Sequence, residues 1–205
     1  GFEVVGIPIV GETTLLVANA SSPYNDAAEL MEAARQNPGE IKFAITPGSV
    51  VQLTTVALEE ENGVRFHQVD PGPKAETLAA LKSNQFDVTL LQYNVVQDFL
   101  EAGEFKALGV IAEERNEKFS EVPTFRELGI EGMEAFEKKF FFYGFPKGTP
   151  TEIVDTFREA MFEATEDPGA IEEFGDMNFD LVQWGTGESI EFITNVRDSF
   201  KPHIG

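Results

Sequence analysis

The regular alternation of short apolar runs with amphipathic segments is the feature that most constrains the fold of this 205-residue chain. Apolar residues spaced three and four apart predict helices, whereas short runs rich in β-branched and aromatic residues predict strands. Ala27, Leu30, Met31 and Ala34, for example, share one face of a helix predicted over 25–36. Strands and helices that alternate with short joints form βαβ units, so we expect an α/β fold with mainly parallel sheets.

The same reasoning assigns most of the chain to regular elements. The segment 2–17 predicts one or two strands, interrupted at Pro8 and Gly11. Further strands are expected at 41–45, 64–69, 86–91, 105–111, 138–145 and 179–184, and further helices at 49–60, 74–82, 94–101, 151–164, 169–174 and 188–200.

The charge balance and the lack of cysteine exclude several classes of function. The chain has 15 Lys and Arg against 36 Asp and Glu, a net charge of −21. Nucleic-acid phosphates and anionic membranes both require positive charge, so neither is an expected partner. Without Cys the chain has no disulfide, thiolate nucleophile or Cys-ligated metal. No run approaches the ~18 apolar residues of a membrane-spanning helix, and no signal peptide is recognised at the first residues.

Motifs for catalysis are sparse. The only histidines are His67, within a predicted strand, and His203, near the last residue. No zinc-protease, Walker or nucleophile-elbow pattern occurs, and Thr186 in the glycine-containing segment 185–189 is interpreted as a helix cap. We therefore predict no catalytic residue, no metal site and no cofactor. A small α/β enzyme that uses His67 or Asp70 stays open as an alternative.

A window without acidic residues, 41–58, contains the candidate binding feature. A strand that ends at Ile45 and a helix that begins near Ser49 direct the unpaired N–H groups of the first helical turn into the crevice beyond the strand. Thr46 and Ser49 add hydroxyl groups, and Gly48 lets a guest approach the backbone. The pattern has two interpretations, a capped helix start or a site for an anion.

Two further segments have a composition typical of a binding cleft. The segment 138–151 contains three Lys, several aromatic residues and no acid, although a core strand explains the aromatic residues equally well. The uncharged strand end 90–94 carries Gln92 and Asn94, which can hydrogen-bond a ligand.

Four segments in order along the chain carry a family resemblance. They read NPGEIKFAITPGSVVQL, FDVTLLQYNVVQDFLEAGEFKALGV, SEVPTFRELGIEGMEAF and FYGFPKGTPTEIVDTFREAM. This series resembles the substrate-binding proteins of tripartite tricarboxylate transporters, the Bug or TctC family. The resemblance implies a fold like the type II periplasmic binding proteins, with two α/β domains that close on a small carboxylate. It also implies an exported, periplasmic protein that is not an enzyme and that delivers its ligand to the membrane permease subunits.

The resemblance also implies a set of ligand-binding residues. In the family, the loop that opens the helix holds a ligand carboxylate through hydroxyls and backbone N–H groups. Asp70, in the loop 69–74, either faces a ligand ammonium or a cation, or caps the helix from Lys74. Family members commonly have an aromatic residue just before the glycine of the segment that crosses between the two domains, and this residue corresponds to Phe142 or Tyr143. Carried over to this chain, the site comprises Thr46, Pro47, Gly48, Ser49, the N–H of Val50, Asp70, Gln92, Tyr93 and Phe142.

Departures from the family pattern shape the remaining expectations. Gln52 stands where a histidine is frequent, and Asp70 where members often have a Pro-Tyr-Lys-Gly segment. The expected ligands therefore include di- and tricarboxylates and aromatic or amino-acid carboxylates. Family members have further chain before the segment that matches Phe2. We thus expect 1–138 to form a nearly complete ligand-binding domain and 139–205 the C-terminal part of the other, incomplete domain. A sensory carboxylate-binding module remains an alternative.

Overall fold

The protein is described here by a computed structural model with two compact units. One unit consists of two chain segments, Gly1–Glu12 and Lys138–Pro202, and is called the split unit; the other contains Thr13–Glu137 and His203–Gly205 and is called the continuous unit. The structure describes residues 1–11, 13–115, 117–133, 136–137 and 139–203.

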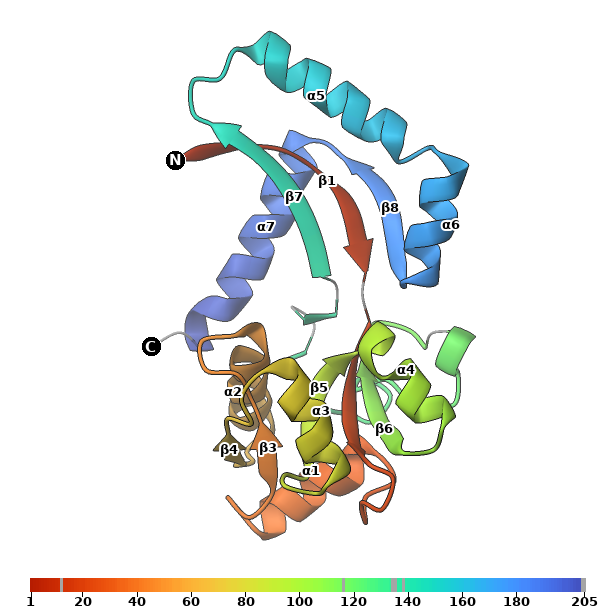
Figure 1. Ribbon diagram of the computed structural model, residues 1–205. Coiled ribbons are helices and arrows are strands. Elements are labelled where there is room, and N and C mark those ends of the chain that lie inside the picture. The colour runs from red at the N-terminus through yellow and green to blue at the C-terminus, as the bar shows by residue number, and fades with distance from the viewer. Residues whose placement is uncertain (12, 116, 134–135, 138, 204–205) are drawn as a thin grey trace. The chain divides into compact units, whose positions relative to one another are not determined.

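The first strand belongs to the split unit, which differs from the domain division expected from the sequence. Strand β1 (Phe2–Gly11) pairs antiparallel with β7 (Lys139–Pro146) on one side and with β8 (Phe179–Trp184) on the other (Figure 1). The second segment of the split unit begins at Lys138. The first twelve residues belong with the C-terminal segment, because the backbone hydrogen bonds of β1 are made there.

Helices pack against this three-stranded sheet of order β7-β1-β8. Buried Val5 of β1 contacts Val154 and Met161 from one face of the first of these helices. Asp167 caps the second helix by accepting a hydrogen bond from the N–H of Ala170 at 2.9 Å. The elements are α5 (Thr151–Ala164), α6 (Pro168–Asp176), α7 (Thr186–Phe200) and the short 3₁₀ helix η3 (Lys201–His203).

The continuous unit has a five-stranded sheet of order β4-β3-β5-β2-β6 (Figure 1). Strand β3 is parallel to both neighbours, whereas β2 is antiparallel to β5 and β6, so this sheet is mixed. Both pairings in the sheet of the split unit are antiparallel, so neither sheet is mainly parallel. A parallel pair needs a crossover connection, and helices α2 and α3 lie between the strands of the parallel pairs β3–β4 and β3–β5. The strands are β2 (Thr14–Asn19), β3 (Lys42–Ala44), β4 (His67–Val69), β5 (Val88–Gln92) and β6 (Phe105–Ile111).

The first helix of the continuous unit follows the predicted periodicity. The residues expected on one face of the first helix, Ala27, Leu30, Met31 and Ala34, are all buried, which confirms that prediction. The second helix ends at Gly63, whose φ of 60° is the left-handed conformation of a helix C-terminus. The elements are α1 (Ala27–Gln36), α2 (Val50–Asn62), α3 (Lys74–Lys82), α4 (Tyr93–Glu101) and the 3₁₀ helix η1 (Glu117–Phe119).

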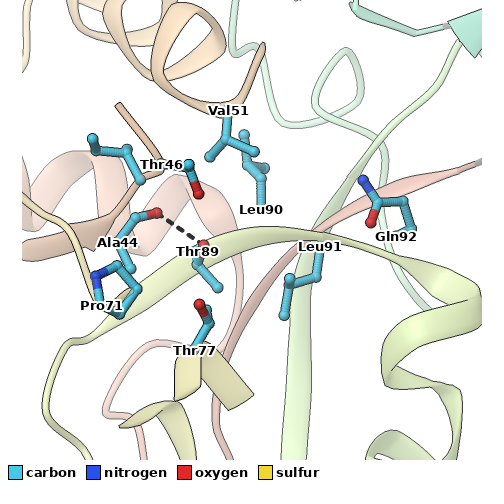
Figure 2. Close-up of a pocket in the computed structure, with 10 residues that line it drawn as sticks. Ala44, Thr46, Val51, Pro71, Thr77, Thr89, Leu90, Leu91 and Gln92 are labelled. Atoms are coloured by element: carbon cyan, nitrogen blue, oxygen red, sulfur yellow. Dashed lines mark hydrogen bonds between the residues drawn. The ribbon is translucent and has the colours of Figure 1, made fainter. Parts of the chain in front are cut away.

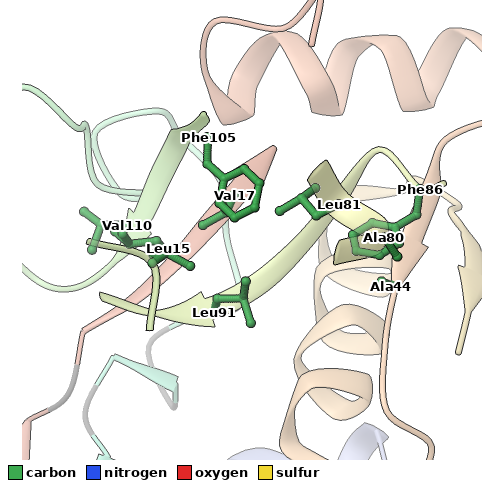
Figure 3. Packing of buried hydrophobic residues seen from close by; sticks show 10 residues of the cluster. Leu15, Val17, Ala44, Ala80, Leu81, Phe86, Leu91, Phe105 and Val110 are labelled. Carbon is green, nitrogen blue, oxygen red and sulfur yellow. The ribbon is translucent and has the colours of Figure 1, made fainter. Parts of the chain in front are cut away.

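A buried cluster between the sheet and its helices forms a core of the continuous unit (Figure 3). It joins side chains from four of the five strands with side chains of α3 and α4, so these elements are held in fixed register. Its buried members are Leu15, Val17, Ala44, Ala80, Leu81, Phe86, Leu91, Val96, Phe105 and Val110.

Candidate functional site

A pocket of about 200 Å³ lies where β3 and β5 end and α2 begins. The parallel strands β3 and β5 supply its base, and the first turn of α2 and the segment before α3 supply further walls. Ligands in open α/β sheets bind in the crevice beyond the carboxyl ends of the strands, and this pocket has that position. Its lining residues are Ala44, Ile45, Thr46, Val51, Pro71, Thr77, Thr89, Leu90, Leu91 and Gln92 (Figure 2).

Thr89 ties the two strands together at the base of the pocket. Its buried hydroxyl donates a hydrogen bond to the Ala44 carbonyl oxygen at 2.9 Å. The hydroxyls of Thr46 and Thr77 point toward Thr89 in Figure 2, and that of Thr77 donates to the Pro73 carbonyl oxygen at 3.4 Å. The base of the pocket is therefore polar but uncharged.

Two polar side chains of the lining keep their hydrogen-bonding capacity for a guest. Thr46 is exposed just after β3, and Gln92 is half-buried at the last position of β5. Within the part of the chain that the structure describes, neither the Thr46 hydroxyl nor the Gln92 amide has a hydrogen-bond partner. Each can donate to a carboxylate oxygen, the Thr46 hydroxyl through one proton and the Gln92 amide through two.

The loop before α2 is a capped helix start. The Ser49 hydroxyl accepts from the N–H of Gln52 at 3.4 Å, and the side-chain oxygen of Gln52 accepts from the N–H of Gly48 at 2.7 Å. The N–H of Ser49 donates to the Thr46 carbonyl oxygen at 3.1 Å, and Gly48 has a φ of 73°. The capping interpretation of this sequence is therefore realised, and two groups expected to hold a ligand are engaged within the loop.

Backbone donors remain at the start of α2 despite this cap. The N–H groups of Val50 and Val51 occupy the first turn, where no intrahelical acceptor exists. The helix dipole adds partial positive charge at this end, and the first turn contains no acidic residue. An anion near Thr46 can therefore interact with these groups without displacing the cap.

The predicted loop residues divide into two sets. Of the predicted ligand-binding residues, Thr46 in this loop and Gln92 at the end of β5 line the pocket. The remaining loop residues lie beside the pocket but do not line it: Pro47, Gly48, Ser49 and Val50.

Asp70 lies next to the lining residue Pro71 but has a structural partner. Its exposed carboxylate accepts a hydrogen bond from the N–H of Gly72 at 2.9 Å. Helix α3 has Pro73 at its N-cap and no side-chain cap, so the expected capping role of Asp70 is wrong. The Asp70 side chain instead forms an Asx-turn, in which the carboxylate accepts from the N–H two residues later.

Tyr93 and Phe142 lie outside the pocket lining. The Tyr93 ring packs at 4.7 Å from the Phe119 ring and contacts the buried cluster of the continuous unit. Phe142 belongs to β7 of the split unit, where its ring stacks on that of Phe2 at 5.8 Å. Both rings therefore make aromatic contacts within their own units, and the Phe142 ring is exposed.

Two polar residues of the lining, Thr77 and Thr89, were not among the predicted ligand-binding residues. Thr89 is the one polar residue before the last position of β5, within a run of buried apolar residues, and that departure was a usable signal. Thr77 lies on α3, a helix with little apolar periodicity, where no local pattern distinguishes a pocket residue from a surface one. The sequence likewise does not distinguish the apolar lining residues Val51, Leu90 and Leu91 from ordinary core residues.

Among the residues that the structure describes, no ionisable side chain lines the pocket. His67, the base considered for an enzyme, is exposed on β4 and is not part of the lining. Across the described ranges, no group of three or more His, Cys, Asp or Glu is arranged to hold a metal ion. The helices in those ranges are also too short or too polar to cross a bilayer.

Comparison with known proteins yields a family match over nearly the whole chain. The family described as "Tripartite tricarboxylate transporter family receptor" matches residues 4–204. A UPF0065 protein of Bordetella pertussis is 28% identical over 168 residues, which cover 80% of this chain and 51% of the relative. The chain thus spans about half the length of the curated relatives that it matches.

Solved structures with the same fold include two from Rhodopseudomonas palustris. One, solved with adipate, has a TM-score of 0.75 and 25% identity over 98% of this chain and 66% of the other. The other, MatC with bound malate, has a TM-score of 0.77 and 23% identity over 98% of this chain and 70% of the other. These similarities establish the fold expected from the sequence, that of periplasmic binding proteins.

Proposed function

The chain belongs to the tripartite tricarboxylate transporter receptor family, and we propose that it is an extracytoplasmic solute-binding protein for a small organic acid. The observation that carries the proposal is the uncharged, donor-rich pocket at the ends of β3 and β5. The ligand class comprises di- and tricarboxylates and aromatic or amino-acid carboxylates, and the solved relatives with adipate and malate support this class. The protein acts in the periplasm without catalysis and delivers its ligand to permease subunits in the membrane.

A carboxylate that enters this pocket must exchange its water hydrogen bonds for protein donors. The Thr46 hydroxyl and the Gln92 amide supply side-chain donors, and the start of α2 supplies backbone N–H groups. A hydrogen bond to a charged group contributes about 1.5–3 kcal/mol, so two or three such bonds are sufficient to hold a carboxylate.

The lack of acidic residues in the segment 41–58 is as important as the donors. The whole chain has a net charge of −21, yet the window 41–58 contains no Asp or Glu. A carboxylate side chain here would repel an anionic ligand at short range, where screening by salt is weak. The local composition thus keeps an acidic protein compatible with an acidic ligand.

The remaining lining favours an organic ligand over a free inorganic anion. Val51, Pro71 and Leu90 present apolar surface to the pocket, which suits the carbon chain of a small acid. The volume of about 200 Å³ suits a small acid rather than a large ligand.

Calorimetric titration of the purified chain with malate, adipate, citrate, benzoate and glutamate tests the proposal. We expect at least one acid to bind, and the variants Thr46→Val and Gln92→Leu each to bind it about tenfold or more weakly, because each loses one charge-assisted hydrogen bond. Thr156→Val is the matched control, since its hydroxyl bonds the Glu152 carbonyl oxygen within α5. Failure of every acid to bind would overturn the proposal, as would unchanged affinity in both pocket variants.

A further inference from the structure

A reciprocal capping arrangement begins helix α1. The Asp26 carboxylate accepts from the N–H of Glu29 at 2.9 Å, and the Glu29 carboxylate accepts from the N–H of Asn25 at 2.8 Å. The hydrogen bonds from Asn25 hold the pKa of Glu29 below its usual value. A carboxylate is the favoured group at this position, because it accepts strongly and interacts well with the helix dipole.

A second turn of the continuous unit repeats the device. The Thr124 hydroxyl accepts from the N–H of Glu127 at 3.1 Å, and the Glu127 carboxylate accepts from the N–H of Thr124 at 2.8 Å. This backbone hydrogen bond, with help from Arg115, lowers the pKa of Glu127. In both places the third residue after the cap is therefore an ionised glutamate.

Helix α2 has the same arrangement with a neutral side chain. Ser49 accepts from the N–H of Gln52, and the Gln52 amide oxygen accepts from the N–H of Gly48 at 2.7 Å. The backbone groups correspond one to one with those at α1, so a glutamate fits the same hydrogen bonds. The difference is the location, because the lining residues Thr46 and Val51 flank this cap on either side.

We propose that Gln52 is a positioning and charge-selecting residue of the pocket between β3, β5 and α2, an inference that rests on the proposed binding of a carboxylate there. Its amide oxygen fixes the N–H of Gly48 and so holds the loop in the conformation that presents Thr46 and the first N–H groups of α2. Because the amide is uncharged, the loop is held without a negative charge beside the bound anion.

The proposal separates stability from affinity. In Gln52→Glu the carboxylate can accept the same hydrogen bond and interact more favourably with the helix dipole, so the melting temperature stays equal or rises. The affinity for a carboxylate falls about tenfold or more, because two like charges then lie near each other in a partly desolvated site. In Gln52→Met the acceptor is lost, so the loop loosens and the affinity falls without added repulsion.

The experiment measures the dissociation constants of malate and adipate and the melting temperature for the purified chain and its variants. Glu29→Gln is the matched control, since it makes the reverse change in the equivalent cap of α1, which does not line the pocket. Gln97→Glu on α4 is the control for one added charge outside the lining. We expect Gln52→Glu alone to combine an unchanged or higher melting temperature with weakened binding that partly recovers in about 1 M salt, where charges are screened over about 3 Å.

Each outcome has a defined meaning. If malate and adipate do not bind the unchanged chain, and citrate, benzoate and glutamate do not bind it either, both the proposed function and this inference are refuted. If the unchanged chain binds and Gln52→Glu binds equally well, only the inference falls. It also falls if Gln52→Glu unfolds, or if its affinity and melting temperature drop together with no recovery in salt, since a purely structural role predicts that result.

Discussion

Replacing Thr89 by valine tests whether the hydrogen bond at the base of the pocket holds β3 and β5 together. Thr89 is 3% exposed, and its hydroxyl donates to the Ala44 carbonyl oxygen at 2.9 Å. Valine has nearly the same shape, so no large cavity forms and the cost comes from the lost donor. A buried acceptor deprived of its partner costs about 1–3 kcal/mol, and we expect Thr89→Val to lower the free energy of unfolding by about 2 kcal/mol.

Urea denaturation followed by far-UV circular dichroism measures this loss. With a slope of about 2 kcal/mol per M, the midpoint should fall by about 1 M at unchanged slope. Thr55→Val is the matched control, because Thr55 is also buried but its hydroxyl bonds the Val51 carbonyl oxygen of its own helix, which already accepts the helical hydrogen bond. Equal midpoints for the Thr89 and Thr55 variants would refute the reasoning.

Two further predictions concern packing and pH. Gly109→Ala should lower the free energy of unfolding by about 1–3 kcal/mol, because the new Cβ would lie 2.8 Å from the buried Phe125 ring; thermal denaturation checks this, and an equally stable variant contradicts it. The pKa of Glu127 is lowered in the folded state, first by the Thr124 N–H and then by Arg115, so its contribution to stability exists at neutral pH and is lost as acidification protonates the carboxylate. Glu127→Gln should therefore show a smaller fall in melting temperature between neutral pH and about pH 4 than the unchanged chain, and identical pH profiles would contradict this assignment.

The helices were largely predictable because their burial repeats with a local period. The apolar positions of 25–36 identified the buried face of α1. Strand pairing was not predictable in the same way, since a strand's pattern reports which residues are buried but not which strand lies beside it. For that reason β1 was expected in the first domain and mainly parallel sheets were expected, whereas β1 pairs with β7 and β8 and β2 is antiparallel to its neighbours.

The candidate site shows the same limit. The order of segments along the chain was enough to indicate the family. It also drew attention to Thr46 and Gln92, because a residue at the end of a strand lies at the carboxyl end of the sheet whichever strands are its neighbours. The hydrogen-bond partner of Thr89 was set only by the tertiary structure, since its hydroxyl donates to a carbonyl 45 residues away. Composition determined that the loop before α2 is free of acids, whereas the tertiary structure decided which of its donors remain for a ligand, because hydrogen bonds within the cap use the others.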